Sequence, residues 1–221
     1  MCFLPYALPI CFSGSVHQVI QMKNKICKKI LLTGGTCAGK TESLPFIKEY
    51  FSKQGYDVYI VNETATMLIL GGITAPKVGE NNFQELLIKM QLETEKIYER
   101  AIELSRNNKN LIIYDRGPID AMMYLDKTEL EKILNKFNTT YEKILNNYAG
   151  IMHMETVAKR LPELYTFDNN KARRDEGNNT INIDNKILEA YKTHPKRVII
   201  NGCKDFKDKI NNLIEKMEEI L

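Results

Sequence analysis

Eight consecutive residues have the composition of a loop that binds phosphate groups. They match the pattern G-x-x-x-x-G-K-[ST] in full and read Gly34, Gly35, Thr36, Cys37, Ala38, Gly39, Lys40 and Thr41. Glycines let the backbone curl so that several N–H groups point inward at phosphate oxygens. Lys40 can bridge terminal phosphates, and the Thr41 hydroxyl can coordinate magnesium. The pattern predicts a site for a polyphosphate with its metal, and the alternative is a chance match in a glycine-containing turn.

A second set of candidate residues follows an apolar run. The segment 111–115 reads LIIYD, and its last residue, Asp115, occupies the place where an acid lies next to magnesium, usually through a water. Arg116 comes next, where it could hold a phosphate or carboxylate of an acceptor, because ligands of open α/β sheets bind beyond the carboxyl ends of the strands. The alternatives are an ordinary acid in a turn and an ion pair between Arg116 and a neighbouring acid.

Glu63 lies just beyond another apolar run, at the same expected edge of the sheet. Its carboxylate could accept a proton from an acceptor hydroxyl or orient a water. The alternative is an acid that begins a helix, where glutamate is favoured by the helix dipole.

The segment 161–180 is polar and weakly periodic, which makes it a candidate lid. It carries the basic residues Lys171, Arg173 and Arg174. An arginine in a lid can stabilise the negative charge that spreads over a transferring phosphoryl group. The alternative is a basic run that faces solvent.

These residues need a scaffold, and the hydrophobic pattern predicts one. Apolar runs at 29–33, 57–61, 111–114, 150–154 and 197–200 are typical of buried parallel strands. Helical patterns separate them, over 41–54, 83–104, from Asp126 through 145, over 183–193 and over 206–217, and Glu129 is placed to form a capping box with Asp126. The alternation predicts an α/β fold with a parallel five-stranded sheet and helices on both faces.

Composition limits the class of protein. The 221 residues predict one domain; 43% are hydrophobic and 27% charged, which excludes a disordered, collagenous or multi-spanning membrane chain. The net charge of +3 is too small to favour nucleic acid as the main partner. The five cysteines are odd in number and lack metal or redox spacing, which favours a reducing, cytoplasmic setting. The three histidines form no triad, and His153, in a strand, is expected in the core.

The segment 1–21 is set apart from the predicted domain, which spans 22–221. It is apolar at first, is interrupted by Pro5 and Pro9, and becomes polar, so it is too short and broken for stable membrane insertion. Met22 opens a normal start for a protein whose first strand follows at once. We expect a disordered leader or a start-site artefact, and a signal peptide is the alternative.

Taken together, these motifs resemble the AAA-type P-loop domain shared by the NadR ribosylnicotinamide kinase region and the TRPL translocation defect proteins. The resemblance covers roughly 28–201. Besides the phosphate loop, it is carried by Asn62-Glu63-Thr64-Ala65, Asp115-Arg116-Gly117 with Asp120 and Tyr124, Leu164-Tyr165-Thr166, Asn169-Asn170-Lys171-Ala172-Arg173, His194-Pro195 and Val198-Ile199-Ile200-Asn201. Thr36 departs from the family pattern, in which many members have proline, and this should alter the stiffness of the loop only.

The resemblance implies a P-loop NTPase fold of the kinase-like type that binds ATP or GTP with Mg²⁺. It implies that Glu63, Asp115 and Arg173 line the site and that Asn201 approaches the nucleotide base.

Two functions follow from these residues. The first is a kinase that transfers the terminal phosphoryl group to a small nucleoside-like acceptor, with Arg174 as a possible second stabilising cation. The second is a nucleotide-dependent regulatory protein with slow hydrolysis and a protein or lipid partner, in which 71–82 and the lid act as switch regions.

Overall fold

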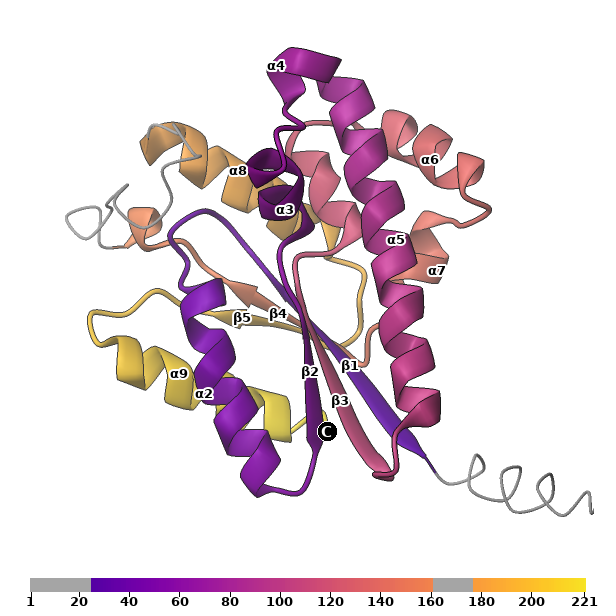
Figure 1. Ribbon diagram of the computed structural model, residues 1–221. Helices are drawn as coiled ribbons and strands as arrows, with labels where there is room; N and C mark the ends of the chain where they lie inside the picture. The colour runs from indigo at the N-terminus through magenta and orange to yellow at the C-terminus, as the bar shows by residue number, and fades with distance from the viewer. Residues whose placement is uncertain (1–24, 161–176) are drawn as a thin grey trace, which may run out of the picture.

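A computed structural model describes residues 25–160 and 177–221. Its strands form one parallel sheet in the order β2-β3-β1-β4-β5 (Figure 1). Their bounds are β1 Ile26–Thr33, β2 Asp57–Val61, β3 Lys109–Asp115, β4 Gly150–Met154 and β5 Arg197–Ile200. All five strands predicted from the hydrophobic pattern are confirmed. The central strand β1 pairs with β3 on one side and β4 on the other, so Leu32 lies opposite both Asp115 and Met152.

Helices cover both faces of this sheet, as the alternation of elements predicts. The α-helices are α2 Lys40–Lys53, α3 Thr64–Leu70, α4 Ala75–Val78, α5 Glu80–Leu104, α6 Lys127–Lys136, α7 Tyr141–Leu145, α8 Gly177–Ala190 and α9 Phe206–Glu218. Two short 3₁₀ helices, η1 Pro118–Met123 and η2 Val157–Lys159, follow β3 and β4. Within the described ranges, no helix combines the length and apolar character needed to cross a bilayer.

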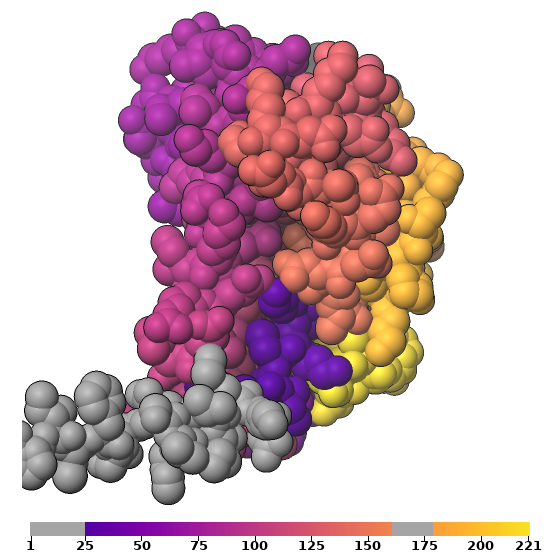
Figure 2. All heavy atoms as spheres, turned by 90° about the vertical axis from the view of Figure 1, so that its right-hand side faces the viewer, coloured from indigo at the N-terminus to yellow at the C-terminus, as the bar shows by residue number. Residues whose placement is uncertain are grey.

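The core consists of two layers because successive strand residues point to opposite faces. Ile30 and Leu32 of β1 pack with α2 and α9, whereas Leu31 packs with α5 to α8 and η1. Figure 2 shows the second layer from outside, with α5 in magenta beside α6 and α7. An ion pair of 2.6 Å between Lys136 of α6 and Glu85 of α5 joins these helices. The inner strands β3 and β4 are therefore buried on both faces, whereas the edge strands β2 and β5 are only partly buried.

One predicted helix is wrong in its length. The pattern after Asp126 predicts a single helix through residue 145, but α6 ends at Lys136 and α7 begins at Tyr141. Asn138 adopts a left-handed conformation with φ of 56°, which asparagine tolerates better than most residues, and the Thr140 side chain caps the new helix. The capping box of Asp126 with Glu129 is confirmed by the contacts between the two residues.

The buried face of α5 is more polar than predicted. Leu86, Ile97 and Leu104 are exposed, although they belong to the amphipathic pattern that predicts a helix over 83–104. The face that packs inward carries buried polar residues at helical spacing, namely Gln84, Gln91 and Glu95, together with Phe83, Ile88 and Ile102. The apolar residues of α5 therefore do not by themselves mark the face that packs inward, because part of that face lines a cavity and is polar.

Candidate functional site

The phosphate loop lies between the end of β1 at Thr33 and the start of α2 at Lys40. Three of its residues have positive φ: Gly34 at 128°, Cys37 at 52° and Gly39 at 81°. A Cβ at Gly34 would lie 2.0 Å from the Met154 carbonyl oxygen, so no other residue fits there. The curl directs the loop to the N-terminus of the 14-residue helix α2, whose dipole favours an anion.

Lys40 bends back over this loop. Its Nζ donates hydrogen bonds to the carbonyl oxygens of Gly35 at 2.7 Å and Gly34 at 3.1 Å, and the side chain is buried. The loop's own carbonyls thus position the ammonium group beside the turn. The arrangement presents a fixed positive charge to a ligand at the loop.

Thr41 and Asp115 meet at the edge of the sheet. The Thr41 hydroxyl donates to Asp115 Oδ2 at 2.8 Å. Burial, assisted by the charge of Glu63, raises the pKa of Asp115, although Lys40 and Arg116 oppose the shift. The other oxygen, Asp115 Oδ1, is buried and accepts no hydrogen bond from any residue in the described ranges.

These two groups fit a magnesium ion. A hydroxyl and a carboxylate are oxygen ligands of the kind that Mg²⁺ prefers, and the buried Oδ1 has no other use in the described part of the chain. That part contains no cluster of three or more acidic, histidine or cysteine side chains able to hold a metal. Phosphate oxygens and waters would have to supply the remaining ligands, as is usual for Mg²⁺.

Arg116 connects the loop with Glu63. Its Nε donates to Glu63 Oε1 at 2.7 Å, and its Nη1 donates to the Gly34 carbonyl at 3.1 Å. The ion pair that the sequence left as the alternative for Arg116 is therefore present. Burial opposes the charge of the guanidinium, but Glu63, Asp120 and Asp115 outweigh burial and raise the pKa of Arg116. Arg116 itself has a positive φ of 74°, which turns its side chain away from the path of an ordinary strand.

Asp120 is a buried carboxylate next to Arg116 that accepts several hydrogen bonds. Its Oδ2 accepts from the Gly117 amide at 2.7 Å and from the Tyr191 hydroxyl at 3.1 Å, and its Oδ1 accepts from the Thr33 hydroxyl. Asp120 Oδ1 also lies 3.5 Å from Arg116 Nη1. The carboxylate thus connects the end of β1, η1 and Tyr191, which follows α8, to the arginine, a role that the sequence motif did not indicate.

A second buried carboxylate, Asp184 of α8, contacts the phosphate loop directly. Its Oδ1 accepts from the Gly35 amide at 2.6 Å, and its two oxygens lie 3.2 Å from His153 Nε2 and 2.5 Å from Lys159 Nζ. Burial disfavours the ionised carboxylate, but these donors outweigh it and lower the pKa of Asp184 to about 2. His153 is in the core, as the sequence predicts.

Lys209 of α9 supports the loop from below. Its buried Nζ donates to the Ala38 and Glu155 carbonyls, each at 2.8 Å. Burial lowers the pKa of Lys209 to about 8. Neither Asp184 nor Lys209 belongs to a local sequence motif. Their contacts with the loop join residues far apart in the chain, so the sequence analysis did not identify them as site residues.

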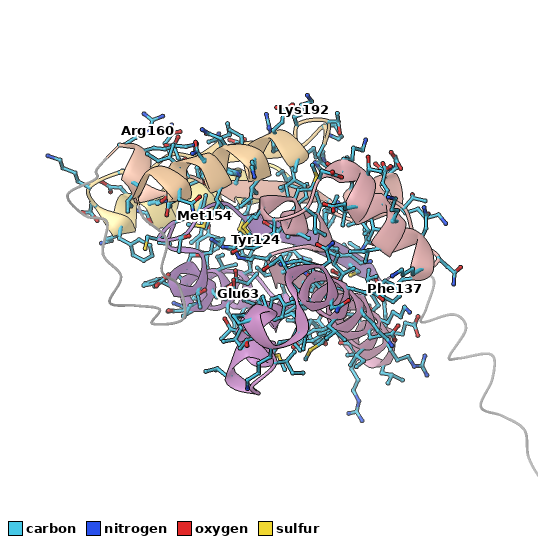
Figure 3. All side chains as sticks on the ribbon, turned by 90° about the horizontal axis from the view of Figure 1, so that it is seen from above. Glu63, Tyr124, Phe137, Met154, Arg160 and Lys192 are labelled. Atoms are coloured by element: carbon cyan, nitrogen blue, oxygen red, sulfur yellow. The ribbon has the colours of Figure 1, made fainter. Side chains whose placement is uncertain are left out.

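A cavity of about 430 Å³ opens beside the phosphate loop. Thr36, Glu63, Arg116 and Asp120 line it at the end nearest the loop, and apolar side chains of α3, α5 and η1 form most of its wall. Figure 3, seen from above, places Glu63 and Tyr124 near the centre of the molecule, whereas Arg160 and Lys192 lie at its rim. The cavity can hold a small molecule next to a ligand of the loop.

The remaining predicted site residues include some that the structure places and some that it does not describe. Arg173, Arg174 and nearly all of the candidate lid, from 161 to 176, fall outside the described residues. Asn201 is exposed after β5, and its Oδ1 accepts from Arg160 Nη2 at 3.3 Å. Cys37 is partly buried within the loop. The structure therefore brings Lys40, Thr41, Glu63, Asp115 and Arg116 together, with Asn201 apart from the cavity.

Comparisons with known proteins agree with this architecture. The model of a family described as AAA domain matches residues 29–209. A crystal structure of NadR protein in complex with NAD and AMP-PNP has a TM-score of 0.61 at 13% identity, covering 92% of this chain and 51% of that one. The structure of deoxyadenosine kinase from M. mycoides with bound dATP has a TM-score of 0.56 at 17% identity, covering 86% and 99%.

At these identities the likeness establishes the fold alone, which is that of the P-loop kinases. The chain spans about half the length of the NadR structures, one of which is in complex with NR. A search of curated protein sequences found no match.

Proposed function

We propose that this chain, which belongs to the AAA domain family, is a kinase that transfers the terminal phosphoryl group of ATP or GTP to a hydroxyl of a small nucleoside-like acceptor. The observation that carries the proposal is the cavity beside the phosphate loop, with Glu63 and Arg116 where the two meet. Hydrolysis needs only a water, whereas a cavity of about 430 Å³ with largely apolar walls suits a small organic molecule.

The residues divide the step between them. The acceptor oxygen forms a bond to the γ-phosphorus while the bond from that phosphorus to the β,γ-bridging oxygen breaks, and the acceptor proton passes to Glu63. Arg116 and Thr66 position the Glu63 carboxylate, donating to its two oxygens at 2.7 Å each. Lys40 and the loop amides stabilise the charge of the phosphates.

Thr41 and Asp115 would hold Mg²⁺. When bound, the ion neutralises phosphate charge and helps to align the triphosphate. Asp115 contributes a carboxylate that its buried position keeps in contact with Thr41. The nucleoside triphosphate, the acceptor and the ion are the partners that this proposal requires.

Three further assignments stay with the proposal as predictions from the sequence. Arg173 and Arg174 would stabilise the transferring phosphoryl group, and Asn201 would approach the nucleotide base. A cytoplasmic location is also expected, since ATP, GTP and reduced thiols occur there.

A second candidate function rests on a different observation. Met67 and Leu70 of α3 and Ile73 after it are exposed, and Leu70 is 82% accessible. Such a surface beside the cavity favours a nucleotide-dependent regulatory protein that binds a protein or lipid partner.

The deciding experiment offers the protein Mg·ATP or Mg·GTP with a panel of nucleosides and ribosides, and measures phosphorylated acceptor and free phosphate. The kinase predicts phosphate on the acceptor, with little release to water. Acceptor-independent hydrolysis, with a partner that binds in one nucleotide state only, would contradict the kinase and support the regulatory protein.

A further inference from the structure

The cavity contains a polar group that the proposed transfer does not use. Gln84 of α5 lines the cavity wall and is only 1% exposed. Its Nε2 donates to Glu80 Oε1 at 2.8 Å, but its Oε1 accepts no hydrogen bond from the described residues. A buried acceptor without a donor costs about 1–3 kcal/mol, so the oxygen needs a partner.

Glu80 determines which atom of the amide is left without a partner. A carboxylate is an acceptor only, so the Gln84 amide must turn its N–H toward Glu80. The reversed amide would bring two oxygens together and lose the hydrogen bond of 2.8 Å. Oε1 is therefore the amide atom left to accept a hydrogen bond from a ligand.

The position of Gln84 along α5 places it away from the reacting end. Gln84 and Gln91 lie seven residues apart, on the same helix face and about 10 Å apart along the axis. Gln91 Nε2 donates to the Arg116 carbonyl at 2.7 Å, so Gln91 marks the end near Glu63. Gln84 marks the far end, and apolar lining residues such as Leu87 and Ile88 lie between them.

We infer that Gln84 selects the acceptor through a hydrogen bond to its Oε1. The molecule bound in the cavity carries a flat ring at the end opposite its reacting hydroxyl. This ring has an N–H donor, such as an exocyclic amine or a carboxamide, that donates to Gln84 Oε1. This inference rests on the proposed kinase function and specifies its substrate class. A ring with a carboxylate at that place is disfavoured, because it would face both the Gln84 oxygen and the charge of Glu80.

The experiment compares acceptors that differ only in this donor. Adenosine is paired with purine riboside, which lacks the amine, and nicotinamide riboside with nicotinic acid riboside, which has a carboxylate. We expect the donor-bearing member of the productive pair to have a kcat/KM about 10- to 100-fold higher, the range for one buried hydrogen bond. Binding of each riboside alone, measured by calorimetry, should show the same order.

Variants locate the effect on one atom. Gln84→Met keeps the length of the side chain without its oxygen, and should reduce the preference to about twofold. Lys89→Met, at an exposed position on the same helix, is the control and should keep it. Glu80→Gln replaces an acceptor-only group with an amide that can also donate, so the Gln84 amide is no longer held in one orientation. The preference for the donor-bearing acceptor should then lie between those of the unaltered protein and Gln84→Met. Affinity for Mg·ATP should be unchanged in all three.

The possible results distinguish a failure of this inference from a failure of the proposed kinase function. Transfer to ribosides without preference for the donor, or a preference that Gln84→Met leaves intact, overturns the inference and leaves the kinase standing. No transfer to any riboside and no binding of one overturns both.

Discussion

The phosphate loop and the acceptor cavity lie side by side but are built differently. The loop is eight consecutive residues, 34–41, that Asp184 and Lys209 hold in place. The cavity wall is assembled from α3, α4, α5, η1 and α8, which together extend from Thr64 to Ala190 along the chain. The phosphate-binding groups of the loop are therefore contributed by neighbouring residues, whereas the lining of the cavity depends on how those five elements pack.

The two regions also differ in how charge is used. Around the loop, buried charged groups contact polar groups of the protein: Lys40 contacts the loop carbonyls, and Asp184 contacts His153 and Lys159. In the cavity most of the wall is apolar, with polar groups at its two ends. A site of this kind binds any ligand that fits and selects by a few hydrogen bonds. We expect substitutions at the loop to abolish function and those in the cavity to change specificity.

The largest expected effect tests the backbone of the loop. Gly34→Ala places a methyl group 2.0 Å from the Met154 carbonyl at a φ of 128°, and should destabilise the fold by about 4 kcal/mol or more. Gly55→Ala is the control, since it also has positive φ, 84°, but meets nothing within 4 Å, and should cost about 1 kcal/mol. Urea denaturation measures both. Equal losses would show that conformation alone, and not the close approach to β4, requires Gly34.

Lys40→Ala tests whether the loop binds phosphate. It should lower the rate of phosphoryl transfer about 10²- to 10³-fold and weaken nucleotide binding, because a fixed charge at the phosphates is lost. Calorimetry with Mg·ATP and Mg·GTP checks the affinity, and circular dichroism checks the fold. Lys48→Ala, at an exposed position on α2, should leave both unchanged. Unaltered nucleotide binding by Lys40→Ala would remove the loop assignment.

Glu63→Gln tests the junction between the two regions. The amide keeps the shape of the side chain but cannot take the proton of the acceptor, so kcat should fall about 10²-fold while the affinity for nucleotide persists. Thr66→Ala removes only one hydrogen bond to Glu63 and should lower kcat less than tenfold. A loss of nucleotide affinity as large as the loss of kcat would assign Glu63 to the loop rather than to the acceptor.

The smallest effect concerns the carboxylate that holds the loop. The pKa of Asp184 is about 2 in the folded protein, below its ordinary value of 3.8, so its ionised form stabilises the fold above pH 4. That contribution, on the order of 2 kcal/mol, should disappear as the pH falls from about 4 to about 2. The free energies of unfolding of the protein and of Asp184→Asn should therefore differ at pH 6 and converge at pH 2. A constant difference would show that the charge of Asp184 contributes nothing.

The sequence predicted most of the scaffold because each strand contains a short apolar run, as is typical of a parallel sheet covered by helices. The sequence analysis missed the break between α6 and α7 at Asn138. The helical spacing of apolar residues continues across this position, although the backbone turns there. The sequence analysis also misjudged the inward face of α5, where Gln84 and Gln91 replace apolar residues. A pattern of residue types cannot distinguish a polar residue that faces solvent from one that faces a cavity.

By itself the sequence determined the phosphate loop, because a curl of amides, a lysine and a hydroxyl need only eight neighbouring residues between a strand and a helix. Only the tertiary structure decided that Arg116 pairs with Glu63, that Asp120 accepts from Thr33 while Asp184 accepts from Gly35, and that Gln84 lines a cavity. The physical reason is distance along the chain. Contacts between residues fifty or more positions apart arise when helices pack on a sheet, and no local pattern of residue types encodes them.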